Sequence, residues 1–430
     1  MDVTTLRGVV ADYGSPVYVY ELTDIDAAQA ALRSSLPAPS TLYYSLKANP
    51  HPVLAARLHR AGCRAEISST GELTAALEAG FRGVDCLYTG PGKTVDEVAR
   101  ALTAGVRRFS VESREDYLRV ARTARRCGVL ADCLVRLNSG HTHGASSLRM
   151  TGRASQFGVE SAAVLEAPER WAPLPGARIA GVHFFPLSNA RSSDDLIAEL
   201  LAGVRLAARL RDEAGIPLEV VDLGGGFAAP YAKPGELPEY QAVRTALEPV
   251  LDEWMPGWRA GRPEVAFESG RYLVGTSGQL VCTVADVKSS GERTFVILDS
   301  GIHHLGGLAG LGRLMPITAV PLPLCSGDDR ASRPEGSQGR GALAGPLCTP
   351  ADLWARDTDV TSLAAGDVVT VPNVGAYGLT ASLIAFLGRP TAAEVALDSG
   401  RVVNASRLEL RRKPLTVHRP DGPLGAGAEG

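Results

Sequence analysis

The stretch that decides the fold is Tyr43-Tyr44-Ser45-Leu46-Lys47-Ala48-Asn49-Pro50. An aromatic and apolar strand runs directly into Lys47, and the Asn-Pro pair then ends the strand and turns the chain toward a helix expected from about residue 51. Lys47 is thereby placed at the carboxyl end of a strand, where ligands collect in α/β folds. A desolvated lysine there can lose its proton and form a Schiff base. The competing interpretation is an ordinary solvated lysine, which is the commoner state.

Outward from this stretch, short apolar strands alternate with amphipathic helices as far as residue 270. A glycine follows most of the expected helices, as is common at helix C-termini. Together with the strand that ends at Lys47, further strands are expected at 64–68, 86–88, 109–111, 133–137, 179–183, 219–223 and 265–268. Eight strands separated by helices predict a (β/α)8 barrel, a TIM barrel, rather than an open sheet.

After residue 270 the pattern changes to short strands without intervening helices, expected at 280–287, 294–298, 317–320 and 367–371. This predicts a second, all-β domain. We expect the barrel to span 30–272, and the β domain to combine 1–29, with a strand at 17–20, and 273–415. The polar stretch 325–345 is interpreted as a flexible excursion, and the tail 416–430 as disordered.

Composition and charge narrow the function classes. The chain has 430 residues, 45% hydrophobic and 21% charged, which is ordinary for a two-domain soluble protein. A net charge of -3 gives no electrostatic reason to expect nucleic acid or an anionic membrane as partner. We see no signal peptide, no apolar run of membrane length, and seven cysteines without metal-ligand spacing. These features favour a reduced, cytoplasmic protein.

Two candidate sites follow barrel strands. Gly224, Gly225 and Gly226 expose backbone N–H groups that can wrap a phosphate, although a glycine run is also a simple tight turn. Glu268 ends the last strand, and Arg271 follows three residues later. The carboxylate could pair with the protonated ring nitrogen of a cofactor, and the guanidinium could bind a phosphate. A surface ion pair between the two side chains is the commoner outcome.

In the β domain, turn-forming residues hold Cys348 and Tyr377 outside regular strands, where they could act as proton donor and phosphate ligand. A lone cysteine is more often a small buried hydrophobe, and a loop tyrosine more often packs. Four histidines, at positions 141, 143, 303 and 304, have no acidic or cysteine partner at ligand spacing, so no metal site is expected.

Taken in order, these stretches resemble the fold-type III pyridoxal phosphate decarboxylases, the family of diaminopimelate, ornithine and arginine decarboxylases, over nearly the whole chain. The matching stretches are 13–20, 43–49, Ser69-Thr70-Gly71-Glu72, Phe157-Gly158-Val159, 224–226, Glu268-Ser269-Gly270-Arg271, Gly345-Pro346-Leu347-Cys348, Gly375-Ala376-Tyr377-Gly378, Arg389-Pro390 and Glu394-Val395.

The resemblance implies an alanine-racemase-like barrel with a C-terminal β domain, and a role for most of the candidates. Lys47 would carry pyridoxal 5'-phosphate through a Schiff base. The run 224–226, Gly270, Arg271 and Tyr377 would bind the cofactor, chiefly its phosphate, and Glu268 would pair with the ring nitrogen. Cys348 would return a proton to the substrate carbon from the neighbouring subunit of a homodimer.

Departures from the family concern the substrate. The histidine that stacks on the cofactor ring is replaced by Phe185, which offers a flat face but no proton, while Ser188 keeps a hydroxyl ligand. Thr349 replaces the acidic residue that binds a distal amine, which argues against diaminopimelate and ornithine. The segment with His303 and His304, candidate substrate contacts, is similar to a secondary-metabolism branch that includes the butirosin pathway decarboxylase, which acts on an aminoacyl group attached to a carrier protein.

We therefore expect decarboxylation of an L-amino acid, free or tethered to a carrier protein, to the amine. Two alternatives stay open. An amino acid racemase of alanine-racemase type usually places an arginine, not a carboxylate, at the ring nitrogen. A non-catalytic pyridoxal phosphate protein would not need the β domain with Cys348 and Tyr377.

Overall fold

A computed structural model describes residues 1–138, 148–149, 156–185, 187–190, 192–306, 317–318, 320–321 and 339–415. Three expectations fall outside these residues: the histidines at 141 and 143, most of the excursion expected at 325–345, and the tail from 416.

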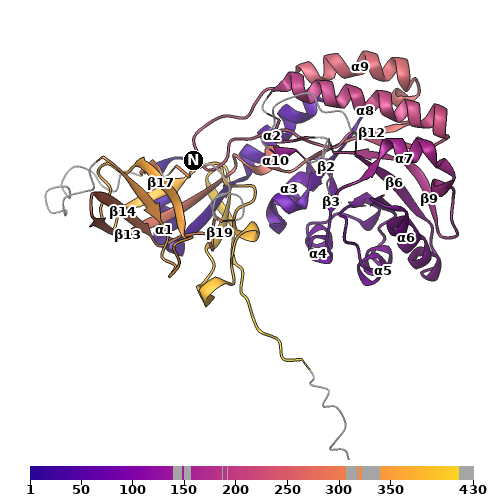
Figure 1. Ribbon diagram of the computed structural model, residues 1–430. Coiled ribbons are helices and arrows are strands. Elements are labelled where there is room, and N and C mark those ends of the chain that lie inside the picture. Colours follow the sequence, from indigo (N-terminus) through magenta and orange to yellow (C-terminus); the bar gives the residue numbers. More distant parts are fainter. Residues whose placement is uncertain are drawn as a thin grey trace, which may run out of the picture.

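Eight parallel strands close into a barrel (Figure 1). Neighbours follow the order β5-β4-β3-β2-β12-β11-β9-β6, and the pairing of β5 with β6 completes the ring. The barrel predicted from the sequence is thus confirmed, and every expected strand is present. The strands are β2 (Thr41–Ser45), β3 (Arg64–Ile67), β4 (Cys86–Tyr88), β5 (Arg108–Val111), β6 (Ala131–Asn138), β9 (Ala177–Phe184), β11 (Val220–Asp222) and β12 (Glu264–Ser269).

The helices cover the outside of the barrel, where Figure 1 shows α8 and α9 along one side and α4 to α6 along another. Sequence analysis missed α1, α7 and α9. The barrel helices are α2 (Leu22–Ser35), α3 (Pro52–Arg60), α4 (Thr70–Glu78), α5 (Val95–Thr103), α6 (Arg114–Arg126), α7 (Ser161–Glu166), α8 (Ser193–Ala214), α9 (Ala242–Trp254) and the single turn α10 (Arg271–Val274).

Local sequence explains where the helices after β3, β4 and β5 begin. The hydroxyls of Ser69, Thr94 and Ser113 each accept a hydrogen bond from the N–H three residues later, which satisfies a backbone donor that the helix itself leaves free. Because Ser69 and Ser113 lie two residues after β3 and β5, these two caps fix their helix N-termini at the carboxyl-terminal mouth of the barrel.

The second unit is a mixed β sheet at the other end of the molecule (Figure 1). Its central strand is β1 (Val17–Glu21), which pairs with β13 and β19 and so joins the N-terminus to the C-terminal half. Helix α1 (Val3–Tyr13) packs beside β1. The other strands are β13 (Gly278–Ser290), β14 (Arg293–Leu298), β15 (Val320–Pro321), β16 (Arg340–Ala344), β17 (Leu353–Asp359), β18 (Val368–Val371), β19 (Ala393–Asp398) and β20 (Arg401–Arg407).

Two expectations for the β domain were wrong. Residues 340–344 form strand β16, paired with β14 and β17, although the polar and glycine-rich surroundings had suggested an excursion. Residues 317–318 are not in a strand, and the strand expected there begins only at Val320. Short strands with small residues are stabilised by pairing with neighbouring strands rather than by the β propensity of their own residues. The sequence of such a strand therefore gives little signal for predicting it.

The two units meet beside Lys47. The side-chain amide of Asn49 donates to the carbonyl of Gly375 at 2.9 Å, and the N–H of Tyr377 donates to the carbonyl of Ala48 at 2.7 Å. These contacts hold the turn after β2 against the loop after β18. In the described part of the chain, no helix has both the length and the apolar content needed to span a bilayer.

Candidate active site at the barrel mouth

Lys47 lies in a single 3-10 turn, Leu46–Ala48, directly after β2. Its ammonium is 3.3 Å from a carboxylate oxygen of Glu66 on β3, and 40% of the Lys47 side chain is exposed. Burial alone would lower the pKa of Lys47, but Glu66, Tyr377 and Glu268 together raise it above its ordinary value. The Lys47 ammonium therefore keeps its proton, although desolvation alone would favour its loss. The Glu66 carboxylate supplies the counter-charge, and the sequence did not reveal this partner.

Glu66 is the buried partner in this pair. Its side chain is 4% exposed, and the hydroxyl of Thr89 donates to it at 2.7 Å. Burial would raise the pKa of Glu66, but the Lys47 ammonium and nearby hydroxyl groups lower it to about 2. Glu66 thus stays ionised and holds the Lys47 amine in place.

Phe185 follows β9, and its ring centroid lies 5.2 Å from the Lys47 nitrogen. The Arg136 guanidinium is 5.8 Å from the same ring and 4.9 Å from the ring of Phe157. Glu112 fixes Arg136 through an ion pair of 2.9 Å, in which the Arg136 side chain is 9% exposed. Phe185 is therefore held as a flat face beside Lys47, at the position predicted for the ring that stacks on the cofactor.

Glu268 ends β12 and is 1% exposed. Its Oε1 has no hydrogen-bond partner among the described residues, although Nε2 of His183 lies 3.2 Å away without the alignment of a hydrogen bond. The other ring nitrogen of His183 is 2.7 Å from the Ser110 hydroxyl. Burial would lower the pKa of His183, but the Glu268 carboxylate raises it above its ordinary value. The Glu268 carboxylate is thus held in a buried ion pair with His183.

Asp222 completes this buried group from β11. Burial and then the Glu268 charge raise the pKa of Asp222 above its ordinary value. One of its oxygens accepts the N–H of Gly224 at 2.9 Å. One atom from each of His183, Asp222 and Glu268 lies within 4.8 Å of the others, so these three are also the candidate cation ligands among the described residues.

The run 224–226 forms a cradle that only glycine allows. A Cβ on Gly224 would stand 2.0 Å from the carbonyl oxygen of Phe184, and one on Gly225 would stand 2.6 Å from that of Glu268. Gly224 and Gly226 also have positive φ angles of 73° and 115°. Ser188, in β10 (Leu187–Ser188), lies beside the run, since the N–H of Ala190 donates to the carbonyl of Gly226 at 2.8 Å.

Arg271 and Tyr377, both predicted to bind the phosphate, are adjacent. The Arg271 guanidinium is 4.7 Å from the Tyr377 ring centroid, and no described carboxylate pairs with it. Tyr377 has a φ of 53°, and its carbonyl accepts the Tyr231 hydroxyl at 3.0 Å. A Cβ on Gly270 would stand 2.7 Å from that of Ala48, so glycine there lets the turn of Arg271 approach the turn of Lys47.

Two predicted residues do not join this cluster within one chain. Cys348 is exposed and Thr349 is half-buried in the loop after β16, and no described hydrogen bond or ion pair links either side chain to the barrel. Asp352 fixes this loop by accepting the N–H groups of Ile302 and Leu347 at 2.8 and 2.7 Å. The roles predicted for Cys348 and Thr349 stay predictions.

His303 and His304 lie deeper than a substrate contact requires. Each is 2% exposed, their ring centroids are 3.7 Å apart, and burial lowers their pKa values to about 3 and 4. His304 Nε2 lies 3.0 Å from the carbonyl oxygen of Pro390. Their proposed contact with the substrate stays a prediction, which this burial does not favour.

Sequence reasoning missed four polar side chains of the site. Glu66, Arg136, His183 and Asp222 all lie within apolar barrel strands near their carboxyl ends. A polar residue inside such a strand was the available signal, because barrel strands place that end at the active site.

Comparison with known proteins agrees with this geometry. Residues 22–275 match the family described as pyridoxal-dependent decarboxylase, pyridoxal binding domain. The L-glutamyl-[BtrI acyl-carrier protein] decarboxylase of Niallia circulans is 30% identical over 93% of this chain and 92% of its own. The diaminopimelate decarboxylase of Pseudomonas fluorescens is 30% identical over 94% and 92%. A crystal structure of a protein from Aquifex aeolicus is 26% identical, with a TM-score of 0.78 over 92% of this chain and 89% of that one.

The site fits pyridoxal 5'-phosphate. Lys47 offers an amine for the aldehyde, the buried carboxylate of Glu268 suits the ring nitrogen, and the glycine cradle with Arg271 suits the phosphate. The chain belongs to the pyridoxal-dependent decarboxylases of fold type III, and residues 22–275, which include the barrel, match the pyridoxal binding domain of that family.

Proposed function

We propose that this enzyme removes the carboxyl group of an L-amino acid, free or tethered to a carrier protein, and releases the amine in a secondary-metabolic pathway. The observation that carries the proposal is the buried carboxylate of Glu268, paired with His183 on the same barrel mouth as Lys47. Bound pyridoxal phosphate supplies an electron sink for the pair left when CO2 departs, provided its ring nitrogen stays protonated. A carboxylate at that nitrogen favours protonation, whereas a racemase would be served by an arginine.

The protein residues then divide the remaining work. Glu66 stays ionised and orients the Lys47 amine through their 3.3 Å contact. His183 and Asp222 surround Glu268 with polar groups in a place that excludes water. Phe185 covers one face of the site with a ring that carries no exchangeable proton, so the proton that replaces CO2 must come from elsewhere.

We assign that proton to the Cys348 thiol, supplied by a second copy of the chain. The thiol is exposed, and no described hydrogen bond or ion pair links it to the barrel of its own chain, which supports a homodimer with shared active sites. Thr349 beside it is uncharged, which supports a substrate without a free distal amine, such as an acyl group bound through its side chain. Six described cysteines, Cys348 included, are free thiols, which supports a cytoplasmic site of action.

The test is CO2 release by purified enzyme loaded with pyridoxal phosphate, over a panel of free L-amino acids and over L-glutamyl thioesters of an acyl-carrier protein. We expect stoichiometric CO2 and amine with at least one of these, and none with Lys47→Ala. Formation of the D-amino acid without CO2 would instead show a racemase and contradict the proposal.

A further inference from the structure

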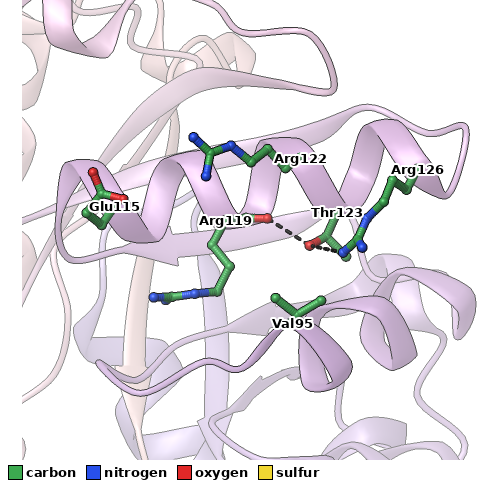
Figure 2. A pocket seen from close by; sticks show the side chains of 6 residues that line it. All are labelled: Val95, Glu115, Arg119, Arg122, Thr123 and Arg126. Atoms are coloured by element: carbon green, nitrogen blue, oxygen red, sulfur yellow. Dashed lines mark hydrogen bonds between the residues drawn. The ribbon is translucent and has the colours of Figure 1, made fainter.

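A basic groove runs along the outer face of α6 (Figure 2). It has a volume of about 440 Å³ and lies between α6 and the start of α5. Three cationic side chains face one acidic side chain in it. The lining residues are Val95, Glu115, Arg119, Arg122, Thr123 and Arg126.

Two of the three cations of the basic groove have no ion pair among the described residues. Arg122 and Arg126 are exposed, and no described carboxylate pairs with either. Arg126 donates only to the hydroxyl of Thr123, at 3.4 Å. Arg119 lies 3.3 Å from Asp116, but that carboxylate is shared with the buried Lys93 at 2.7 Å. In a chain of net charge -3, this local positive field attracts an anionic partner.

The helix that carries the basic groove begins just after β5, at the barrel mouth. A second cavity of about 230 Å³ lies there, lined among others by Glu112, Arg114 and Arg170. Glu112 pairs with Arg136, whose guanidinium faces Phe185 beside Lys47. Because α6 begins at the barrel mouth, a partner seated along it has one end close to the catalytic residues.

We propose that the basic groove docks the acidic surface of a carrier protein, whose flexible arm then passes Arg114 and Arg170 to deliver an aminoacyl group to the barrel mouth. The inference rests on the proposed function, since only a tethered substrate needs such a surface. The length of α6 supports a carrier protein over nucleic acid as the partner. A helix of 13 residues spans about 20 Å, which is long enough to contact one helix of a small protein. Electrostatic docking of this kind acts mainly through association and weakens with salt.

The test compares one acyl group in two forms: an L-glutamyl thioester of an acyl-carrier protein and the L-glutamyl thioester of pantetheine alone. With Arg122→Glu and with Arg122→Glu/Arg126→Glu, we expect kcat/KM to fall about tenfold or more for the carrier form and to stay within about twofold for pantetheine. The matched control is Arg205→Glu, an exposed arginine without a described ion pair on α8, which should leave both values unchanged. Raised salt should reproduce the selective loss in the wild type.

Equal losses on both substrates, or the same loss in the control, would overturn the inference. If neither thioester releases CO2 in the wild type, the proposed glutamyl substrate fails separately, and binding of the unloaded carrier by surface plasmon resonance still decides the docking. There, Arg122→Glu should weaken binding about tenfold, while unchanged affinity, or tighter binding of a single-stranded RNA oligonucleotide, would contradict a carrier site. Circular dichroism confirms that each variant is folded.

Discussion

Lys47 and Glu66 form an ion pair at the barrel mouth. The Lys47 side chain is 40% exposed, so solvent screening limits the strength of the ion pair. The buried Glu66 carboxylate nevertheless sets the direction in which the Lys47 amine points. The amine is thereby held charged and oriented until a carbonyl group replaces the ion pair as its partner.

Glu66→Gln should destabilise the cofactor-free protein in a pH-dependent way. Its folded pKa of about 2 lies below its ordinary 4.5, so its stabilising effect is complete above pH 4.5 and is lost as the pH falls toward 2. The difference in thermal unfolding midpoint between wild type and variant should therefore be constant from about pH 5 to 8 and shrink at pH 3.5. Glu236→Gln, at an exposed loop position, is the control. A difference independent of pH would contradict the assignment.

Gly225→Ala should weaken pyridoxal phosphate binding by about tenfold or more, because the new Cβ would meet the Glu268 carbonyl oxygen at 2.6 Å and the Phe185 ring at 3.2 Å. Equilibrium dialysis of the cofactor measures this. Gly92→Ala, where a Cβ meets nothing within 4 Å, should bind normally. Normal binding by both variants would show that the cofactor does not use the cradle.

The elements show what sequence could and could not predict. All eight barrel strands were predictable because parallel barrel strands are short apolar runs separated by capped helices. Lys47, Glu268 and the run 224–226 were predictable because each directly follows or ends such a strand. The sequence did not single out Glu66 and His183 as partners of these residues. Strand order and register decide which polar side chains meet at the barrel mouth, and neither can be read from the sequence of a single strand. Strand β16 was missed because its small residues depend on neighbouring strands.

Helix α6 offers a test at this scale. Ser113→Ala removes the hydroxyl that accepts the N–H of Asp116 at 3.0 Å, and should lower the free energy of unfolding by about 1 kcal/mol. Urea unfolding followed by circular dichroism measures it. Ser113→Asp restores a capping oxygen and should recover most of the loss; no recovery would mean that the cap is not the cause.

At the scale of the whole molecule, the β domain supplies residues that its own barrel does not use. We propose a division in which residues 1–29 and 273–415 form this domain, supported by the position of β1 between β13 and β19. We propose that its exposed Cys348 loop reaches the barrel of a second copy.

Mixing two inactive variants tests that arrangement. Lys47→Ala and Cys348→Ala homodimers should each be severely impaired, and subunit exchange should restore about a quarter of wild-type activity, because half the dimers are mixed and each has one intact site. Mixing either variant with itself is the control. No recovery, with exchange verified by mass spectrometry of labelled subunits, would place Cys348 in the site of its own chain or outside the reaction.

The most direct measurement is a crystal structure of the enzyme loaded with pyridoxal phosphate. The account predicts that the cofactor is bonded to the Lys47 nitrogen, lies against the Phe185 ring, and has its ring nitrogen within about 3.2 Å of a Glu268 oxygen. A ring nitrogen directed away from Glu268, or a cofactor bound to another lysine, would contradict it.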